Sequence, residues 1–208
     1  MKLLTTIFTF IIFGLSVPSD SSQISLSEGA PHWIMNTSNP GKSSEYKDLL
    51  LREGITLSIT KIDQDEIDAD PLSVLVHKAS QIGERILVDD TSLDVEGENV
   101  GVNLRWVIED IPSYAGKKAV WRVLLGYRED NRVFVYSGEV KGTIVHPNFE
   151  NDPTLEALFL PDDSDFTLNL DKPDALNPRA LAIDAFINDE PVAVLPIMDS
   201  WNGPWQNH

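Results

Sequence analysis

Two neighbouring carboxylates that follow an apolar run could hold a metal ion. Asp89 and Asp90 come directly after residues 85–88, a short buried-strand candidate. Loops at strand ends gather ligands in α/β sheets, so we expect both acids at a cleft. Glu66 lies in the acidic stretch DQDEIDAD. Hard oxygen ligands of this kind bind Mg²⁺, usually as one or two carboxylates completed by substrate phosphates. DQDEIDAD alone is more typical of a solvated charge run, whereas Asp89-Asp90 favours a metal site.

A second group of residues could bind phosphate. The turn over residues 37–42, Thr-Ser-Asn-Pro-Gly-Lys, opens a helix predicted over 43–52. Backbone N–H groups point outward at a helix start, the helix dipole favours an anion, and Lys42 adds a positive charge. The Walker A pattern G-x-x-x-x-G-K-[ST] is not satisfied. Taken alone, the segment is more typical of an ordinary strand-to-helix turn.

Composition and motifs exclude several other chemistries. The chain has no cysteine, which excludes disulfides, a thiolate nucleophile and cysteine-based metal centres. Its four histidines have no metal-ligand spacing, and G-x-S-x-G, H-E-x-x-H and G-x-G-x-x-G are all absent from the sequence. Ser/His hydrolase chemistry therefore has no support. We expect His77, which neighbours Lys78 on a predicted helix, to lie at the surface.

The charge balance limits the partners of the chain. Its 16 Lys and Arg against 33 Asp and Glu give a formal net charge of −17, so most of the surface should repel nucleic acid and anionic lipid. An anionic substrate would need a metal ion and a few local bases. With 208 residues, 42% of them hydrophobic, the chain can bury one sizeable core, and one domain is the natural count.

The elements that must position these residues mix strands and helices. Strands are predicted over 32–35, 55–61, 85–88 and 140–145, and a hairpin over 119–136 with its turn at 128–131. Further helices are predicted from Asp70-Pro71, a capping pair, to Gly83, and over 174–186. Crossover and hairpin connections together favour an α/β domain with a mixed sheet.

The first residues differ from the rest of the chain. Lys2 is the only charge before Asp20, and residues 3–17 are almost wholly apolar, which is typical of a secretory signal peptide cut after Ser16. We expect residues 1–22 to be signal peptide and linker, the chain to be exported to the periplasm or medium, and no membrane span to remain after cleavage. Without processing the chain would be cytoplasmic. A buried first element and an uncleaved anchor are the alternatives.

Taken in order, the segments resemble the inosine/xanthosine triphosphate pyrophosphatase family. The family's T/S-x-N-x-x-K loop corresponds to residues 37–42, its acid after the second strand to Glu66, and its V-[ED]-D-[TS]-x-L motif to residues 88–93. Its basic–aromatic pair, G-x-x-x-G-x-I strand, F-G-[YW]-D-P motif and S-H-R-x-x-A-L motif correspond to 105–106, 138–144, 149–153 and 177–181. The resemblance covers residues 33–186 and identifies the chain as a divergent member.

The resemblance implies an elongated α/β domain with a central cleft, a Mg²⁺ cofactor and usually a homodimer. Its activity would be hydrolysis of a nucleoside triphosphate to the monophosphate and pyrophosphate. Asp90 would be the catalytic residue and would hold the metal with Glu66, supported by Asp89. The phosphates would be held by Thr37, Asn39, Lys42 and Arg105, and the base by Phe149, Asp152 and Arg179.

Departures from the family pattern concern the base. Residues 149–153 read Phe-Glu-Asn-Asp-Pro, and the family's Ser-His pair is Asn177-Pro178. A buried polar site that reads a base edge discriminates strongly, so its loss relaxes that choice. The alternative to an enzyme is a non-catalytic nucleotide-binding or interaction module that kept the fold. Pyrophosphate release across a panel of triphosphates would distinguish the two.

An extra C-terminal segment, 187–208, ends the single domain expected over 30–208. Residues 192–197 resemble a strand, and Trp201 and Trp205 are aromatic groups that can each bury ~150–250 Å². We expect this tail to pack on the domain or across a dimer interface. The alternative is a frayed terminus.

Overall fold

The computed structural model describes residues 30–147 and 154–206, which form a mixed α/β domain around a seven-stranded sheet. The strands are β1 His32–Asn36, β2 Thr56–Thr60, β3 Ile86–Val95, β4 Lys118–Glu129, β5 Arg132–Ile144, β6 Phe159–Pro161 and β7 Ala193–Pro196. The helices are α1 Pro40–Arg52, α2 Pro71–Ser80, α3 Leu104–Val107, α4 Leu155–Leu158 and α5 Pro178–Ile187, with 3₁₀ turns η1 Ile111–Tyr114 and η2 Asp174–Leu176. The predicted fold class is confirmed.

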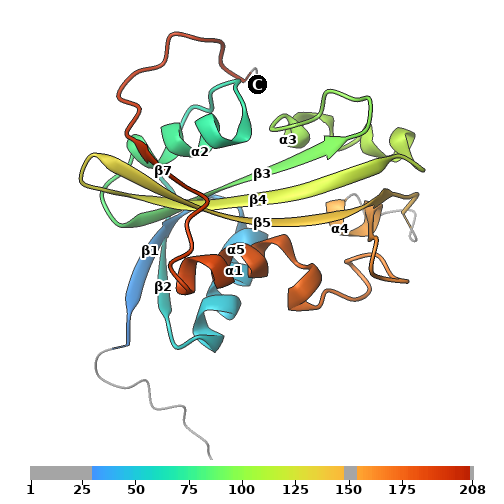
Figure 1. The fold of residues 1–208 in the computed structure, drawn as a ribbon, viewed down its shortest axis with the longest axis horizontal. Coiled ribbons are helices and arrows are strands. Elements are labelled where there is room, and N and C mark those ends of the chain that lie inside the picture. Colours follow the sequence, from blue (N-terminus) through green and yellow to red (C-terminus); the bar gives the residue numbers. More distant parts are fainter. Residues whose placement is uncertain (1–29, 148–153, 207–208) are drawn as a thin grey trace, which may run out of the picture.

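Helices cover both faces of the sheet. The strand order is β2-β1-β3-β4-β5-β6, with β7 also paired to β5. In Figure 1, α1 and α5 lie below the sheet, and α2 and the C-terminal tail lie above it. Side chains alternate along a strand. Leu87 and Leu125 therefore lie in the core between the sheet and helices α1 and α5, whereas Val88 and Leu124 lie in the core between the sheet and α2.

Strand β3 is longer than predicted and contains the acidic pair. It runs parallel to β1, with Ile34 beside Ile86 and Met35 beside Leu87, and pairs antiparallel with β4 from Val88 onward. Asp89 and Asp90 therefore lie inside β3 rather than in a loop after a short strand, so that prediction was wrong. β4 pairs with one edge of β3 from Val88 onward, whereas β1 pairs with the opposite edge only as far as Leu87. Since β1 ends just there, the other edge of β3 is free to border a cleft.

Three further predicted boundaries were wrong. The helix predicted over 43–52 begins earlier, at Pro40, because Asn39 caps it. β5 is continuous from Arg132 to Ile144, so residues 140–145 are not a separate strand. The helix predicted over 174–186 is split into η2 and α5. Pro178 cannot lie inside a helix without losing a hydrogen bond, but it suits a first helical position, and the Asn177 side chain caps the new start.

Glycine brings α5 directly onto β5. A Cβ on Gly138 would lie 2.0 Å from the carbonyl oxygen of Pro178 and 2.6 Å from the backbone nitrogen of Ala182. Any larger residue would therefore push the start of α5 away from the sheet. The first glycine of the G-x-x-x-G-x-I segment thus sets the position of Arg179, the second residue of that helix.

The tail packs on the domain, one of its two expected positions. β7 pairs antiparallel with the first half of β5. Trp201 packs against the buried cluster of Ile67, Val74 and Val102, and the ring centroid of Trp205 lies 5.5 Å from that of His77. Within residues 30–147 and 154–206, no helix is both long and apolar enough to span a membrane. The predicted signal peptide lies outside the described residues.

Candidate active site

A cleft of about 660 Å³ brings the predicted site residues together. Its walls come from the start of α1, the loop after β2, α2, the middle of β3, α3 and the start of α5. Eight of the ten predicted site residues line it: Thr37, Asn39, Lys42, Glu66, Asp89, Asp90, Arg105 and Arg179. The other two, Phe149 and Asp152, lie outside the described residues.

The start of α1 forms the end of the cleft that suits phosphate. The Asn39 side chain accepts a hydrogen bond from the backbone N–H of Lys42 at 3.1 Å, and the backbone N–H of Asn39 donates to Thr37 Oγ1 at 3.2 Å. This cap and Pro40 fix where the helix begins. Lys42 Nζ lies 2.9 Å from Asp89 Oδ2, which holds the ammonium beside the helix N-terminus.

Asp89 and Asp90 point to opposite faces of the sheet, because they are consecutive residues of a strand. Asp89 faces α1 and α5, where it meets Lys42. Burial acts to raise its pKa, but the charges of Lys42, Arg179 and Lys78 outweigh burial, so the pKa of Asp89 lies below its usual value. Asp89 is therefore ionised at neutral pH and orients Lys42.

Asp90 faces α2 and meets a buried lysine. Lys78 Nζ lies 3.4 Å from Asp90 Oδ1 and 3.0 Å from Glu66 Oε1, so it joins the two carboxylates. Burial raises the pKa of Asp90 to about 6, against the opposing charges of Lys78 and Lys42. Burial acts to lower the pKa of Lys78, but the two carboxylates outweigh it and hold that pKa above its usual value. At neutral pH, Asp90 can exist in either protonation state while Lys78 stays charged.

Lys78 was missed at the sequence level, and its neighbour His77 was predicted wrongly. His77 is only 5% exposed, because the tail covers the side of α2 that faces away from the sheet. Lys78 follows Leu75 by three residues and precedes Ala79, so it borders the apolar stripe of the helix. A lysine at the border of the apolar stripe of a helix was the feature of the sequence that could have predicted a charged group in a cleft.

The donor set suits Mg²⁺ as an ion shared with a substrate. Among the described residues, no three His, Asp or Glu groups are gathered tightly enough to hold a metal alone. Asp90 Oδ2 is buried and has no hydrogen-bond partner among those residues, and Glu66 lies on the same side of the cleft. Mg²⁺ commonly takes one or two protein carboxylates and completes its shell with phosphates and water. Glu66 and Asp90 fit that requirement, whereas Asp89 is turned toward Lys42.

Asn36, at the end of β1, holds the loop that carries Glu66. Its side-chain nitrogen donates to the Ile62 carbonyl at 2.9 Å and to Gln64 Oε1 at 3.0 Å, and its oxygen accepts from the Ile62 N–H at 2.8 Å. Gln64 in turn donates to the Lys78 carbonyl at 2.8 Å. The loop and α2 are therefore tied together beside the two carboxylates. Sequence reasoning missed Asn36, which directly precedes the predicted turn over residues 37–42.

The α5 side of the cleft, which we call the base end, holds Arg179 in an ionic network. Arg179 is 7% exposed, and its guanidinium donates to Glu45. Glu45 also lies 2.7 Å from Lys172 Nζ and accepts from Asn177 Nδ2 at 2.8 Å. Lys172 lies 3.2 Å from Glu156. Burial disfavours the charge on Glu45, but Arg179 and Lys172 outweigh it and lower the pKa of Glu45. Glu45 gave no signal in the sequence, since it lay on an ordinary helix face.

Arg105 lies on the α3 wall of the cleft. Its side chain is exposed, and the guanidinium carbon is 5.0 Å from the ring centroid of Trp106. It can therefore meet a ligand in the cleft without breaking an ion pair. This position is compatible with the predicted contact to phosphate.

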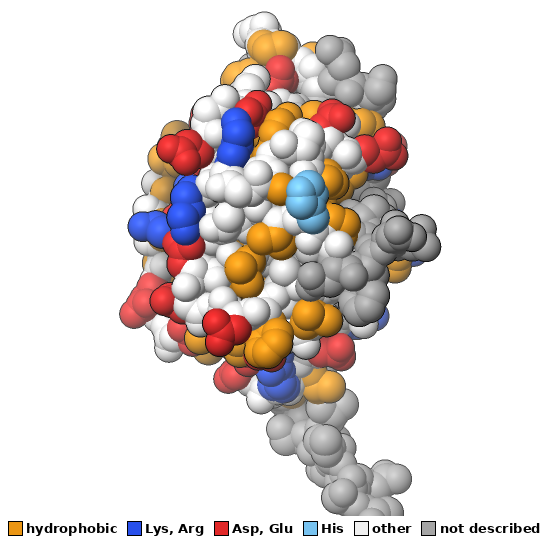
Figure 2. All heavy atoms as spheres, turned by 90° about the vertical axis from the view of Figure 1, so that its right-hand side faces the viewer, with side chains coloured by type: hydrophobic (Ala, Val, Ile, Leu, Met, Phe, Trp, Pro, Cys, Tyr) orange, Lys and Arg blue, Asp and Glu red, His pale blue; other side chains and the backbone are white. Residues whose placement is uncertain are grey.

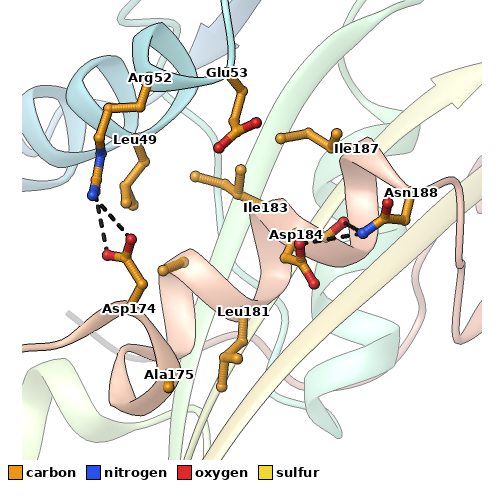
Figure 3. Close-up of a pocket in the computed structure, with 11 residues that line it drawn as sticks. Leu49, Arg52, Glu53, Asp174, Ala175, Leu181, Ile183, Asp184, Ile187 and Asn188 are labelled. Atoms are coloured by element: carbon orange, nitrogen blue, oxygen red, sulfur yellow. Dashed lines mark hydrogen bonds and ion pairs between the residues drawn. The ribbon is translucent and has the colours of Figure 1, made fainter.

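A second hollow, of about 380 Å³, lies between the end of α1 and α5 (Figure 3). Leu49, Ile183 and Ile187 line it, and the exposed ion pair between Arg52 and Asp174, 2.9 Å apart, closes one side. It contains no buried titratable group. The chemistry of the described residues is concentrated in the larger cleft.

Known proteins resemble this chain over most of the domain. The Ham1 family model matches residues 33–189. A dITP/XTP pyrophosphatase of Methanopyrus kandleri is 26% identical over 174 residues, which cover 74% of this chain and 93% of that protein. An inosine triphosphate pyrophosphatase of Yarrowia lipolytica is 27% identical over 149 residues, covering 62% and 77% of the two chains. The resemblance predicted from the motifs is confirmed, and the tail from residue 190 onward lies beyond the family match.

Proposed function

This chain belongs to the Ham1 family, and from that membership and its cleft we propose that it is a Mg²⁺-dependent nucleoside triphosphate pyrophosphatase. Water would add across the bond between the α- and β-phosphates, giving the nucleoside monophosphate and pyrophosphate. One observation carries the proposal. Asp90, a buried carboxylate with a pKa of about 6, shares a cleft with Glu66 and with Lys42 at the start of α1.

Each residue has a part in this reaction. Glu66 and Asp90 would hold Mg²⁺, which neutralises phosphate charge and polarises a phosphorus–oxygen bond when bound. Asp90 would also orient the attacking water and accept its proton, since it is the carboxylate placed beside the metal position. Lys42 and the N–H groups of α1 would hold the phosphates, with Thr37 and Asn39 shaping the loop. Asp89 orients Lys42.

Local charge is needed because the chain as a whole repels anions. The formal net charge is −17. Figure 2 shows one end of the molecule, where acidic side chains stand around the margin and Lys and Arg are fewer. Lys42, Lys78 and Arg105 line the cleft and would supply positive charge to a triphosphate. A bound Mg²⁺ would supply more.

We propose that base choice is relaxed. Arg179, the residue implied for base binding, is engaged by Glu45, and Asn177-Pro178 replaces the family's Ser-His pair. The relatives are named for dITP, XTP and inosine triphosphate. We infer that this chain accepts purine nucleoside triphosphates more broadly. Phe149 and Asp152 keep their proposed place at the base.

Export and a homodimer are part of the same proposal. The apolar stretch over residues 3–17 supports export, and the family resemblance supports the dimer. N-terminal sequencing of protein from its own host should give a start near residues 17–23. The mass in solution should be about twice that of one chain. An intact Met1 on soluble cytoplasmic protein, or a monomeric mass, would contradict these two points.

The reaction itself is tested by identifying the products. Purified protein, a purine nucleoside triphosphate and Mg²⁺ should give equal amounts of pyrophosphate and monophosphate, and chelation of Mg²⁺ should stop the reaction. Release of orthophosphate and a diphosphate would contradict the proposed bond. A folded protein that releases nothing from any triphosphate would favour the non-catalytic binding module.

A further inference from the structure

The end of the tail, residues 197–206, contacts three elements that line the cleft: α2, the loop that carries Glu66, and α3. We call this segment the C-terminal strap. It begins at the end of α2, the helix that carries Lys78. The Met198 N–H donates to Ser80 Oγ at 2.8 Å, and Gln81 Nε2 donates to the Met198 carbonyl at 3.1 Å. The strap is thus fixed to the first of three elements that line the cleft.

Further along, the strap pairs with the loop that carries Glu66. The Gln206 N–H donates to the Glu66 carbonyl at 2.9 Å, and the Asp68 N–H donates to the Pro204 carbonyl at 2.9 Å. Ile67 and Trp205 form an antiparallel bridge between these two bonds. The backbone on both sides of Ile67 is held, and Glu66 is the last residue before that point.

Gln206 connects the loop to the third element, α3. Its side chain is buried, with the residue 6% exposed. Nε2 donates to the Ile67 carbonyl at 3.1 Å, and Oε1 accepts from Trp106 Nε1 at 3.3 Å. Trp106 is next to Arg105, which lines the cleft. One side chain therefore joins the Glu66 loop to the helix that carries Arg105.

The conformation of the strap is itself well specified. Trp201 Nε1 donates to the Pro204 carbonyl at 2.8 Å, and a Cβ on Gly203 would lie 2.3 Å from the Trp201 ring. The Trp205 ring meets His77 edge to face. The segment is a fixed turn with two aromatic anchors, so it can hold the loop in one position.

We propose that the C-terminal strap positions Glu66 for metal binding and that Gln206 is its positioning residue. The inference rests on the proposed function, since it assigns Glu66 to Mg²⁺. The family match ends at residue 189, so the strap lies beyond the matched domain. None of its residues lines the cleft, and it therefore acts through Glu66 and α3 rather than on a ligand.

The test compares wild type with Gln206→Leu, which keeps the size of the side chain and removes both of its hydrogen bonds. A chain that ends at Ser200 is the second variant, and a chain that lacks only residues 207–208 is the control. Amide hydrogen exchange over residues 61–68 and the Mg²⁺ concentration at half-maximal pyrophosphate release are measured for each.

In both variants we expect faster exchange over residues 61–68 and a half-saturating Mg²⁺ concentration raised roughly tenfold, because loss of a residue that orients a metal ligand commonly costs 10–100-fold in metal affinity. Saturating Mg²⁺ should largely restore turnover. A purely structural role would lower the melting temperature without moving the Mg²⁺ dependence. The control should match wild type.

Unchanged exchange over residues 61–68 in Gln206→Leu would overturn the proposal, as would faster exchange with an unchanged Mg²⁺ dependence. If wild type releases no pyrophosphate, the proposed function fails separately. In that case, amide hydrogen exchange over residues 61–68, measured with and without Mg²⁺, is the remaining test of the strap. Protection by Mg²⁺ in wild type that is lost in Gln206→Leu supports it, and equal behaviour of the two chains overturns it.

Discussion

The two ends of the cleft are both built from ion pairs, but they leave different groups open to a ligand. At the phosphate end, Lys42 and Lys78 hold carboxylates that themselves line the cleft, and Asp90 Oδ2 has no hydrogen-bond partner among the described residues. At the base end, Glu45 engages Arg179, Lys172 and Asn177 together. The first end leaves a carboxylate oxygen open to a metal ion, whereas at the second end Glu45 holds one nitrogen of Arg179 and the buried Nε of Arg179 has no hydrogen-bond partner among the described residues.

This difference separates the residues that would hydrolyse the triphosphate from those that would recognise the base. The residues that would bind phosphate and metal match the family motifs one by one, whereas the base end has replaced two motif residues by Asn177-Pro178. The buried pair of Arg179 and Glu45 is costly to break, so the Nε of Arg179 is the donor that remains open to a base. We therefore expect the chemistry to depend strongly on the phosphate end, and base choice to depend weakly on the other.

Asp90→Asn should give the largest effect. An amide cannot take a proton from water and is a poorer ligand for Mg²⁺, so turnover should fall by roughly 10²–10⁴-fold with the fold intact. Turnover at saturating Mg²⁺ and triphosphate is the measurement. Asp94→Asn is the matched control, because Asp94 lies in the same strand but is exposed and pairs with Arg122. Near-normal turnover in Asp90→Asn would remove the catalytic assignment.

Lys78→Met should give the largest loss of stability. It leaves Asp90 and Glu66 without their shared cation, and removing one partner of a buried pair costs about 3 kcal/mol or more. Added Mg²⁺ should recover part of this loss, because a metal ion can replace the missing charge. Urea unfolding with and without Mg²⁺ measures both effects. Lys118→Met, which breaks an exposed pair with Asp162, should cost only about 0.5 kcal/mol. Equal losses in the two variants would contradict the account of the phosphate end.

Glu45→Gln should destabilise the base end by about 2 kcal/mol, since hydrogen bonds to charged groups contribute about 1.5–3 kcal/mol. The effect should depend on pH. The pKa of Glu45 is lower in the folded chain than its ordinary value of 4.5, so its contribution is present above pH 4.5 and is lost as the pH falls through the folded pKa. The difference between wild type and Glu45→Gln, measured by urea unfolding, should be constant from pH 7 to 4.5 and shrink below that. Shrinkage above pH 4.5 would show that Glu45 is not the anion of this network.

The smallest effect is expected at Asn177, which caps α5 and also donates to Glu45. Asn177→Ala should cost about 1 kcal/mol, the usual value of a helix cap. Asn177→Ser, which restores the family's residue, keeps the cap and loses the bond to Glu45, so its melting temperature should lie between those of wild type and the alanine variant. A serine variant as unstable as the alanine variant would show that the cap contributes little.

Local signals in the sequence were enough for much of the fold. Asp70-Pro71 marks the start of α2, and Asn39-Pro40 in the predicted turn marks the start of α1. The length of β3 could not be read locally, because Asp89 and Asp90 become strand residues only through pairing with β4. The break at Asn177-Pro178 was readable in principle, since proline favours a first helical position.

The site divides in a similar way. The eight described residues predicted for it share one cleft, because their motifs lie at the ends of elements that the topology brings together. Lys78, Glu45 and Asn36 were missed, because their roles depend on which face of an element meets the cleft. His77 was assigned to the wrong environment for a related reason: its cover comes from Trp205, which is far away in the sequence.

The measurement that most directly tests the contrast between the two ends is kcat/KM for a panel of triphosphates, namely ITP, XTP, dITP, GTP and ATP, at saturating Mg²⁺. An intact phosphate end and a base end whose Arg179 is held by Glu45 predict pyrophosphate from every member, with kcat/KM values within roughly tenfold of one another. A site that reads a base by hydrogen bonds rejects the wrong one by ~10⁴-fold or more. Preference of that size for one base would contradict the account of the base end, and no release from any member would contradict the account of the phosphate end.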